Sequence, residues 1–298
     1  MKKFLYRLRG YCSRLFENDE TERLILGSIA SKMQDYMDSN LHNHEFKIFS
    51  QYGDDGIIQY LVKHLEISNK TFIEFGVESY SEANTRFLLM NNNWSGLVID
   101  GSRRNISKLR RKSWYWNFDL ESEVAFIDVE NINSLICRDG FRDLGILHID
   151  IDGNDYHILK AIDIEFLNPA LMILEYNAVF GMERSISVPY DPKFVRNNAH
   201  YSNLYFGASL SALNGLCDAY GYDLIGCNSA GNNAYFLRRD LVNESIKCLT
   251  TREAFVDSKF RESRDIDYGL SLLSGDKRLE ALKGLPVLNV MTGEIEEL

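Results

Sequence analysis

Seven short runs of apolar residues, separated by helical patterns, organise the chain between residues 71 and 239. The first run, TFIEFGV at residues 71–77, is rich in β-forming side chains and ends on a carboxylate and a glycine. The other runs are residues 96–100, 124–128, 145–150, 171–175, 222–227 and 233–239. Continuous apolar strands that alternate with helices are typical of parallel sheets whose two faces are covered. We therefore predict an α/β fold with a doubly wound, mostly parallel sheet of seven strands, the last two forming an antiparallel hairpin.

The two ends of the chain differ from this middle part. Residues 1–16 carry apolar side chains at helical spacing, with five basic side chains and no acid between them. A short basic amphipathic helix can lie on an anionic membrane surface, dock on its own domain or pair with a second subunit. We favour docking or pairing over membrane contact. The predicted organisation is an N-terminal helical extension (1–48), a main domain (49–240) and a C-terminal extension (241–298) whose tail adds an edge strand.

Two polar, irregular stretches flank the predicted strands. Residues 49–56 (FSQYGDDG) form a turn before a helix, which Asp54 or Asp55 would cap. A helix just before the first strand commonly covers a cofactor crevice. Residues 178–206 form a long irregular segment with two of the four prolines of the chain. A loop of that length inside a compact domain is usually functional and is often a lid.

Composition narrows the class of protein. The chain has 298 residues, a net charge of −10 and 45% hydrophobic residues, which is ordinary for a globular protein but argues against a nucleic-acid partner. The five scattered cysteines have no metal-site or redox spacing, so we expect reduced thiols. No apolar run approaches the ~20 residues that span a bilayer. We predict a cytoplasmic protein, peripheral at the inner membrane face only through its N-terminal helix.

Acids stand at the ends of the five predicted parallel strands, and a doubly wound sheet binds its ligands at that edge. These acids are Glu74, Asp100, Asp128, Asp150 and Glu175. After Gly76 no second glycine follows at the spacing that admits a pyrophosphate, and the phosphate-cradling motif of nucleotide hydrolases is also missing. The pattern therefore favours a ligand with a ribose and no phosphates over NAD or ATP. S-adenosylmethionine (SAM) is such a ligand.

Each strand end then has an expected role toward SAM. Gly76 would permit close approach of the methionyl part, because it has no side chain. Glu74 would face the ammonium group of SAM. Asp100 would accept hydrogen bonds from both ribose hydroxyls, since an ionised carboxylate is a strong acceptor. Asp128 would lie near the adenine edge.

The order and spacing of several motifs resemble FkbM-type methyltransferases. These motifs are SQYGDDG, FIEFGV, VIDGS, LHIDIDGND, LEYN, YFGASLSAL and NAYFLRRD, within residues 49–240. They are most similar to a bacterial subgroup associated with the assembly of surface glycans or natural products. The resemblance implies a Rossmann-like class I fold and SAM-dependent O-methyltransferase activity. On this basis we add to the cofactor site Gln51, Tyr52, Gly53, Asp54, Gly101 and Ser102. At the fourth strand the family often has Lys-Ile-Asp-Val-Glu-Gly where this chain has HIDIDG at residues 148–153.

The ends of the fourth and fifth strands also offer a metal site. Asp150 and Asp152 follow one strand, while Glu175 and Asn177 follow the next. Adjacent strand ends lie close together, and such oxygen ligands suit Mg²⁺ or Mn²⁺. Metal-dependent O-methyltransferases use a similar arrangement, in which the ion lowers the pKa of the acceptor hydroxyl. The open alternative is that Asp152 or Asp155 acts directly as a general base.

His200, in the long loop, is a further candidate base, whereas we interpret His148 as a core residue. The main hypothesis is a SAM-dependent O-methyltransferase that acts on a hydroxyl of a glycan or glycan precursor. A non-catalytic SAM-binding scaffold protein of a glycan-assembly complex is the alternative, with the basic N-terminus and the arginine-rich segment 101–112 as partner surfaces. A nucleotide-sugar transferase is a third hypothesis, which the missing pyrophosphate features disfavour. The amphipathic N-terminal helix is compatible with a homo-oligomer.

Overall fold

The chain folds around a seven-stranded sheet, seen here in a computed structural model that describes residues 19–34 and 38–298. The strands are β1 (Thr71–Phe75), β2 (Ser95–Asp100), β3 (Leu120–Val124), β4 (Ile146–Ile149), β5 (Leu171–Glu175), β7 (Tyr222–Cys227) and β8 (Asn233–Arg238). Their order is β3-β2-β1-β4-β5-β8-β7. The strands β1 to β5 are parallel, and β8 runs antiparallel to both β5 and β7. The predicted Rossmann-like sheet with a final antiparallel hairpin is therefore confirmed.

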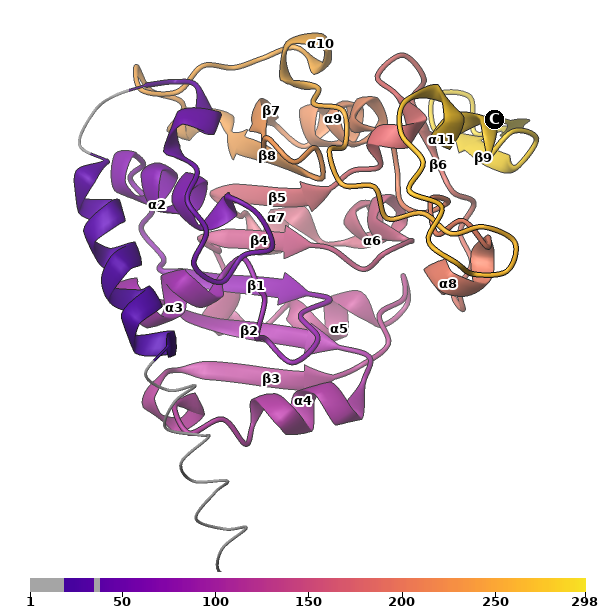
Figure 1. Cartoon of the computed structure of the whole chain (residues 1–298). Coiled ribbons are helices and arrows are strands. Elements are labelled where there is room, and N and C mark those ends of the chain that lie inside the picture. Colours follow the sequence, from indigo (N-terminus) through magenta and orange to yellow (C-terminus); the bar gives the residue numbers. More distant parts are fainter. Residues whose placement is uncertain (1–18, 35–37) are drawn as a thin grey trace, which may run out of the picture.

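Helices cover both faces of this sheet (Figure 1). They are α2 (Asp54–His64), α3 (Arg86–Asn92), α4 (Arg103–Leu109), α5 (Ile132–Ile136), α6 (Asp155–Ala161), α7 (Ile164–Leu167) and α9 (Leu210–Ala219). Successive side chains of β1 point to opposite faces. Ile73 and Phe75 pack with α5, α6 and α9, whereas Phe72 packs with α2, α3 and α4. Because both faces are buried, this strand reads as a continuous apolar run.

The third strand was predicted in the wrong place. It comprises Leu120–Val124 rather than 124–128. As an edge strand it has one solvated face, where Glu121 and Glu123 both form ion pairs with Arg138. Its sequence therefore alternates and has no apolar run. The apolar run at 124–128 belongs mostly to the loop that follows, where Phe126 is 54% exposed.

Residues 19–33 form a helix that packs beside α3. The Glu20 carboxylate lies 3.0 Å from Nη2 of the buried Arg86, whose guanidinium also stacks on the Phe49 ring. The other face of this helix exposes Ile25, Leu26, Ile29 and Met33. The predicted basic helix at 1–16 lies outside the described residues. None of the helices among the described residues has the length and apolarity needed to cross a bilayer.

The C-terminal tail was expected to extend the main sheet but forms a second one. Strand β9 (Pro286–Asn289) lies between β10 (Ile295–Glu297) and β6 (Ile186–Ser187). Since β6 belongs to the long segment 178–206, the tail anchors that segment, as the shared apolar cluster around Ile186, Leu204 and Val287 also shows. Figure 1 places this sheet and α8 (Arg196–Ala199) beyond the carboxyl ends of the parallel strands.

Short helices complete the chain. They are η1 (Leu41–His44), η2 (Tyr115–Asn117), η3 (Asp139–Phe141), η4 (Ala178–Phe180), η5 (Arg239–Leu241), α10 (Thr251–Ala254) and α11 (Asp276–Glu280).

Candidate functional site

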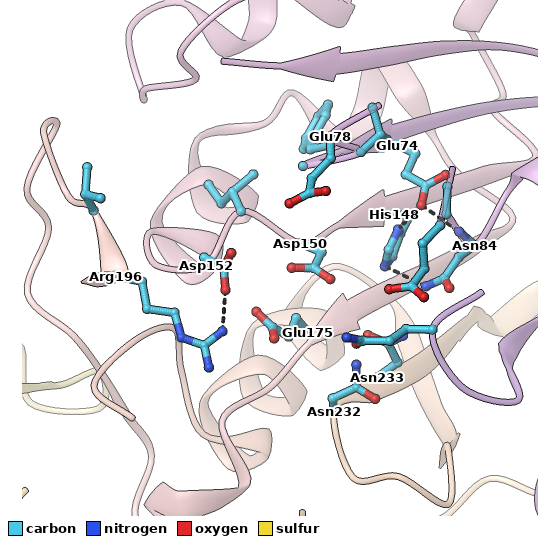
Figure 2. Close-up of a pocket in the computed structure, with 18 of the residues that line it drawn as sticks. Glu74, Glu78, Asn84, His148, Asp150, Asp152, Glu175, Arg196, Asn232 and Asn233 are labelled. Carbon is cyan, nitrogen blue, oxygen red and sulfur yellow. Dashed lines mark hydrogen bonds and ion pairs between the residues drawn. The ribbon is translucent and has the colours of Figure 1, made fainter. Parts of the chain in front are cut away.

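A cavity of about 580 Å³ opens at the carboxyl ends of β1, β4 and β5. The strand order reverses between β1 and β4, which is where doubly wound sheets bind ligands. Figure 2 shows how side chains from these strands converge with Arg196 of α8. The lining has one arginine, Arg196, and seven acids: Glu74, Glu78, Glu82, Asp150, Asp152, Glu175 and Glu262. Such a lining favours ligands that are cationic or rich in hydrogen-bond donors.

Gly76 lies where the loops after β1 and β4 touch. Its φ is +72°, and a Cβ at this position would lie 1.7 Å from the carbonyl oxygen of Asp150. Only glycine fits this conformation and this contact. The first and fourth strand ends can therefore meet with bare backbone between them, and the predicted approach of the methionyl part to Gly76 stays a prediction.

Glu74 is fully engaged by its own chain. Its Oε1 accepts hydrogen bonds from the Asn84 N–H (2.9 Å) and His148 Nδ1 (3.0 Å), and its Oε2 accepts from the N–H and hydroxyl of Thr85. Burial opposes charge on both members of the Glu74–His148 pair, but their hydrogen bond and mutual attraction lower the pKa of Glu74 and raise the pKa of His148. His148 is thus a core residue, as predicted. Glu74 primarily ties β1 to β4 and to the start of α3.

His148 extends this network to the pocket wall. Its Nε2 lies 3.1 Å from the Asn84 amide nitrogen, and both residues line the cavity (Figure 2). The histidine that stands in place of the family lysine therefore has a defined partner on each ring nitrogen. It holds the end of β4, and so Asp150, in position.

Asp100 ends β2 beside the cavity and is half-buried. Its two oxygens accept hydrogen bonds from the N–H groups of Glu78 (2.8 Å) and Ser102 (2.7 Å). Ser102 then caps α4 through its hydroxyl. A Cβ built on Gly101 would lie 3.4 Å from the exposed ring of Phe126, which lines the cavity. A carboxylate and an aromatic ring therefore stand together at this strand end, and the aromatic ring was missed from the sequence.

The turn before α2 has a different role from the one predicted. Of its four proposed cofactor contacts, only Gln51 lines the cavity. Gly53 is the N-cap of α2, so neither Asp54 nor Asp55 caps that helix. Asp55 folds the turn instead, because its Oδ2 accepts three backbone N–H groups, each at 2.7 Å. Tyr52 stacks on Phe260 at 6.0 Å, and Asp54 is fully buried.

Three acids meet at the ends of β4 and β5. Carboxylate oxygens of Asp150, Asp152 and Glu175 all lie within 4.8 Å of one another. Burial and the charge of Asp152 raise the pKa of Asp150 to about 7. Burial and the charge of Asp150 raise the pKa of Glu175 well above its ordinary range. Like charges this close repel one another, so the cluster calls for a cation or a proton.

The long segment 178–206 contributes the one arginine of the lining, Arg196. Its Nη1 pairs with Asp152, its Nε donates to the carbonyl oxygen of Asn203, and its guanidinium stacks on Phe206 at 3.8 Å. The segment therefore covers the side of the cavity where the three acids lie. The sequence predicted a lid here but gave no sign that Arg196 was its contact.

Nine of the predicted site residues do not line the cavity: Tyr52, Gly53, Asp54, Asp100, Gly101, Ser102, Asp128, Asn177 and His200. The Asn177 amide nitrogen donates to the carbonyl oxygens of Leu204 and Phe206, and its Oδ1 accepts from the Val179 N–H. Asn177 therefore holds the lid rather than joining the acids. His200 interacts with the Ser202 hydroxyl. Asp128 accepts hydrogen bonds from the N–H groups of residues 130 and 131 and so caps a turn.

No family model and no curated protein matches the chain. Solved structures with a similar fold include the O-methyltransferase of Bacillus cereus in complex with SAH (S-adenosylhomocysteine), with 13% identity, a TM-score of 0.42, and coverage of 74% of this chain and 89% of that one. TrmK of M. capricolum with SAH has 10% identity, a TM-score of 0.37, and coverage of 63% and 69%. The N-terminal domain of EvdMO1 with SAH and D-fucose has 13% identity, a TM-score of 0.35, and coverage of 56% and 73%. At these values the likeness concerns the fold alone, and the resemblance to FkbM-type enzymes stays a prediction.

Proposed function

We propose that the protein is a SAM-dependent O-methyltransferase that acts on a hydroxyl group of a glycan or glycan precursor. The observation that carries this proposal is the division of the cavity at the β1–β4 reversal. Its cofactor side (Glu74, Gly76 and Asp100) has a lining glycine, Gly76, and a carboxylate, Asp100, that adjoins the lining through the N–H of Glu78. On its acceptor side (Asp150, Asp152 and Glu175) lie three acids under a lid.

The cofactor side fits SAM in shape and in polarity. Gly76 lines the cavity and has no side chain, so a ligand can approach the backbone there. Each carboxylate oxygen of Asp100 accepts one hydrogen bond from the chain and retains a lone pair for a ribose hydroxyl. The exposed ring of Phe126 offers a face on which adenine can stack. SAM supplies the methyl group when it is bound here.

The acceptor side fits a divalent ion. Glu175 is only 7% exposed, and its Oε2 is buried without any hydrogen-bond partner. An unpaired buried acceptor is costly, and Mg²⁺ or Mn²⁺ would satisfy it together with Asp150 and Asp152. Such an ion would lower the pKa of a hydroxyl bound to it.

The residues of the chain then align the reactants. Carboxylate and amide oxygens dominate the wall, and these groups accept hydrogen bonds from a polyhydroxylated acceptor. Asp150 and Asp152 are the groups that can take the proton of the reacting hydroxyl. The Glu74–His148 pair fixes the end of β4, and Arg196 holds the lid to Asp152.

Calorimetric titration with SAH tests the cofactor side. We expect binding by the wild-type protein and at least tenfold weaker binding by Asp100→Asn, because the variant loses charged acceptors for the ribose. Asp128→Asn is the matched control and should bind like wild type, since the Asp128 carboxylate caps its own turn. Folded wild-type protein that does not bind SAH would contradict the proposal.

Transfer of a labelled methyl group from SAM to monosaccharides and nucleotide sugars tests the reaction. Treatment with EDTA should abolish transfer, and Mg²⁺ or Mn²⁺ should restore it; unchanged activity would rule out the metal. SAH binding without transfer to any hydroxyl acceptor would instead favour the scaffold function, for which the exposed apolar face of helix 19–33 offers a partner surface.

A further inference from the structure

Two buried oxygen atoms of the cavity wall have no hydrogen-bond partner. They are Oε2 of Glu175 and Oδ1 of Asn233, whose residues are 7% and 2% exposed. Glu175 ends β5 and Asn233 begins β8, and the two are directly paired in the antiparallel ladder. The Cβ atoms of such partners lie roughly 5 Å apart on the same face of the sheet. Two acceptors without a donor therefore stand side by side at the edge of the acceptor side.

Asp54 fixes which atom of the Asn233 amide faces Glu175. This carboxylate is fully buried and accepts hydrogen bonds from Asn228, from Asn233 Nδ2 (3.0 Å) and from the Tyr235 hydroxyl (2.6 Å). An ionised carboxylate can only accept hydrogen bonds. A reversed amide would place Oδ1 of Asn233 against it, oxygen to oxygen. Asn233 must therefore direct Nδ2 toward Asp54 and present Oδ1 on the other side.

Neither orphan oxygen, Oε2 of Glu175 or Oδ1 of Asn233, has a hydrogen-bond donor among the described residues. Arg196 pairs with Asp152, but the orphan atoms of Glu175 and Asn233 receive no hydrogen bond from it or from any other described residue. Figure 2 shows Asn233 beside Glu175 on the wall opposite Glu74. Hard divalent ions take several oxygen ligands at once, and an asparagine carbonyl is among their usual ligands. A single ion at the three acids would thus give both orphan oxygens a partner.

We infer that Oδ1 of Asn233 is a ligand of the divalent ion, and that Asp54 is the positioning residue that aims it. This inference rests on the metal site of the proposed function. Asn233 takes the place that the sequence predicted for Asn177, whose amide the lid uses instead. It also assigns a role to Asp54, which was expected to contact the cofactor but lies outside the cavity lining.

Calorimetric titration of the full chain with Mn²⁺ tests the inference without any acceptor. Wild-type protein should bind the ion, and Asn233→Ala should bind it about 10–100-fold more weakly, the loss typical when the support of a metal site is removed. Asp54→Asn should give a similar loss, because the new amide can donate to Oδ1 of Asn233 and turn it away from the ion. Tyr235→Phe is the matched control: it removes a different hydrogen bond of Asp54 and should leave affinity within about twofold.

The SAH affinity and circular dichroism of each variant establish that it is folded, and Asn233→Ser replaces Asn233→Ala if the alanine variant is not. Wild-type Mn²⁺ affinity in both the Asn233 and the Asp54 variants would overturn the inference and leave the three-acid metal site intact. Failure of the wild-type protein to bind Mn²⁺ would overturn the inference together with the metal. SAH binding in that same sample would show that the cofactor proposal survives.

Discussion

The two sides of the cavity contain the same kind of residue in opposite states. On the cofactor side, Glu74 accepts four hydrogen bonds from the chain and Asp100 accepts two. On the acceptor side, burial and the charge of a neighbouring acid raise the pKa of both Asp150 and Glu175, and Glu175 keeps a buried oxygen without a partner. An acid at a strand end is therefore not evidence of a ligand by itself. The acids that the fold leaves unsatisfied are the ones that indicate a ligand.

Equivalent substitutions of an acid on the two sides should therefore change the free energy of unfolding by different amounts. A satisfied acid contributes to stability, so its loss should destabilise the fold. An unsatisfied acid in a repulsive cluster opposes folding, so its loss should affect ligand binding and little else. The following predictions test this difference, beginning with the largest expected effect.

Gly76→Ala should force apart the loops that follow β1 and β4. Its Cβ would lie 1.7 Å from the Asp150 carbonyl oxygen, so the strand ends must separate. We expect a loss of more than about 4 kcal/mol in the free energy of unfolding, with loss of SAH binding. Gly181→Ala is the control, because φ is +70° there but nothing lies within 4 Å of the added Cβ. It should cost about 1–3 kcal/mol, from backbone strain alone. Equal effects in urea unfolding would contradict the role of Gly76.

Glu74→Gln and Glu175→Gln form a matched pair across the cavity. The Glu74 change breaks a buried pair with His148 and places a side-chain NH2 group against a backbone N–H that donates to the carboxylate in the wild type. We therefore expect the free energy of unfolding to fall by about 3 kcal/mol. The Glu175 change relieves repulsion from Asp150, so stability should stay within about 1 kcal/mol of wild type or increase. Denaturant unfolding measures both. The reverse order of stabilities would refute the distinction between the two sides.

Asp55, which folds the turn before α2, should make the stability of the fold sensitive to pH. Burial raises the pKa of Asp55 to about 6, despite the backbone N–H groups that donate to it. The folded state therefore prefers the protonated form, and stability should fall as the pH rises from about 4 to about 6. The loss is at most about 3 kcal/mol, from a shift of about two pKa units. Asp55→Asn should make this slope shallower, and the part that comes from Asp150, whose pKa is raised to about 7, should remain. A variant whose pH profile parallels that of wild type would show that Asp55 is not its source.

Mn²⁺ should stabilise the acceptor side alone. An ion that binds only the folded state adds about 2.7 kcal/mol at a concentration of 100 times its Kd. The Tm of the wild-type protein should therefore rise with Mn²⁺, whereas that of Glu175→Gln should stay constant. Glu74→Gln keeps the three acids and should still respond. A response to Mn²⁺ in Glu175→Gln equal to that of wild type would place the ion elsewhere.

The fold could be predicted because its central strands are buried on both faces. β1, β2, β4 and β5 appear as uninterrupted apolar runs, and the connecting helices have one apolar face. The prediction failed where that condition fails. β3 lies at the edge of the sheet, so its alternating sequence LESEV has no such run, and the tail joins β6 rather than the main sheet.

The candidate site was harder to predict because its chemistry depends on contacts between distant residues. Strand ends indicated where the acids would gather. The sequence could not show that Glu74 would be satisfied by Asn84, Thr85 and His148. Nor could it show that the lid would use the Asn177 amide, while Asn233 from the antiparallel hairpin would stand next to Glu175.

A crystal structure of the protein with SAH and Mn²⁺ would test the division of the cavity most directly. We predict SAH at Gly76 and Asp100, with the Phe126 ring against its adenine. We predict an anomalous Mn²⁺ peak bounded by Asp150, Asp152, Glu175 and Asn233. SAH bound among those acids, or a cavity that holds neither molecule at saturating concentrations, would contradict the account.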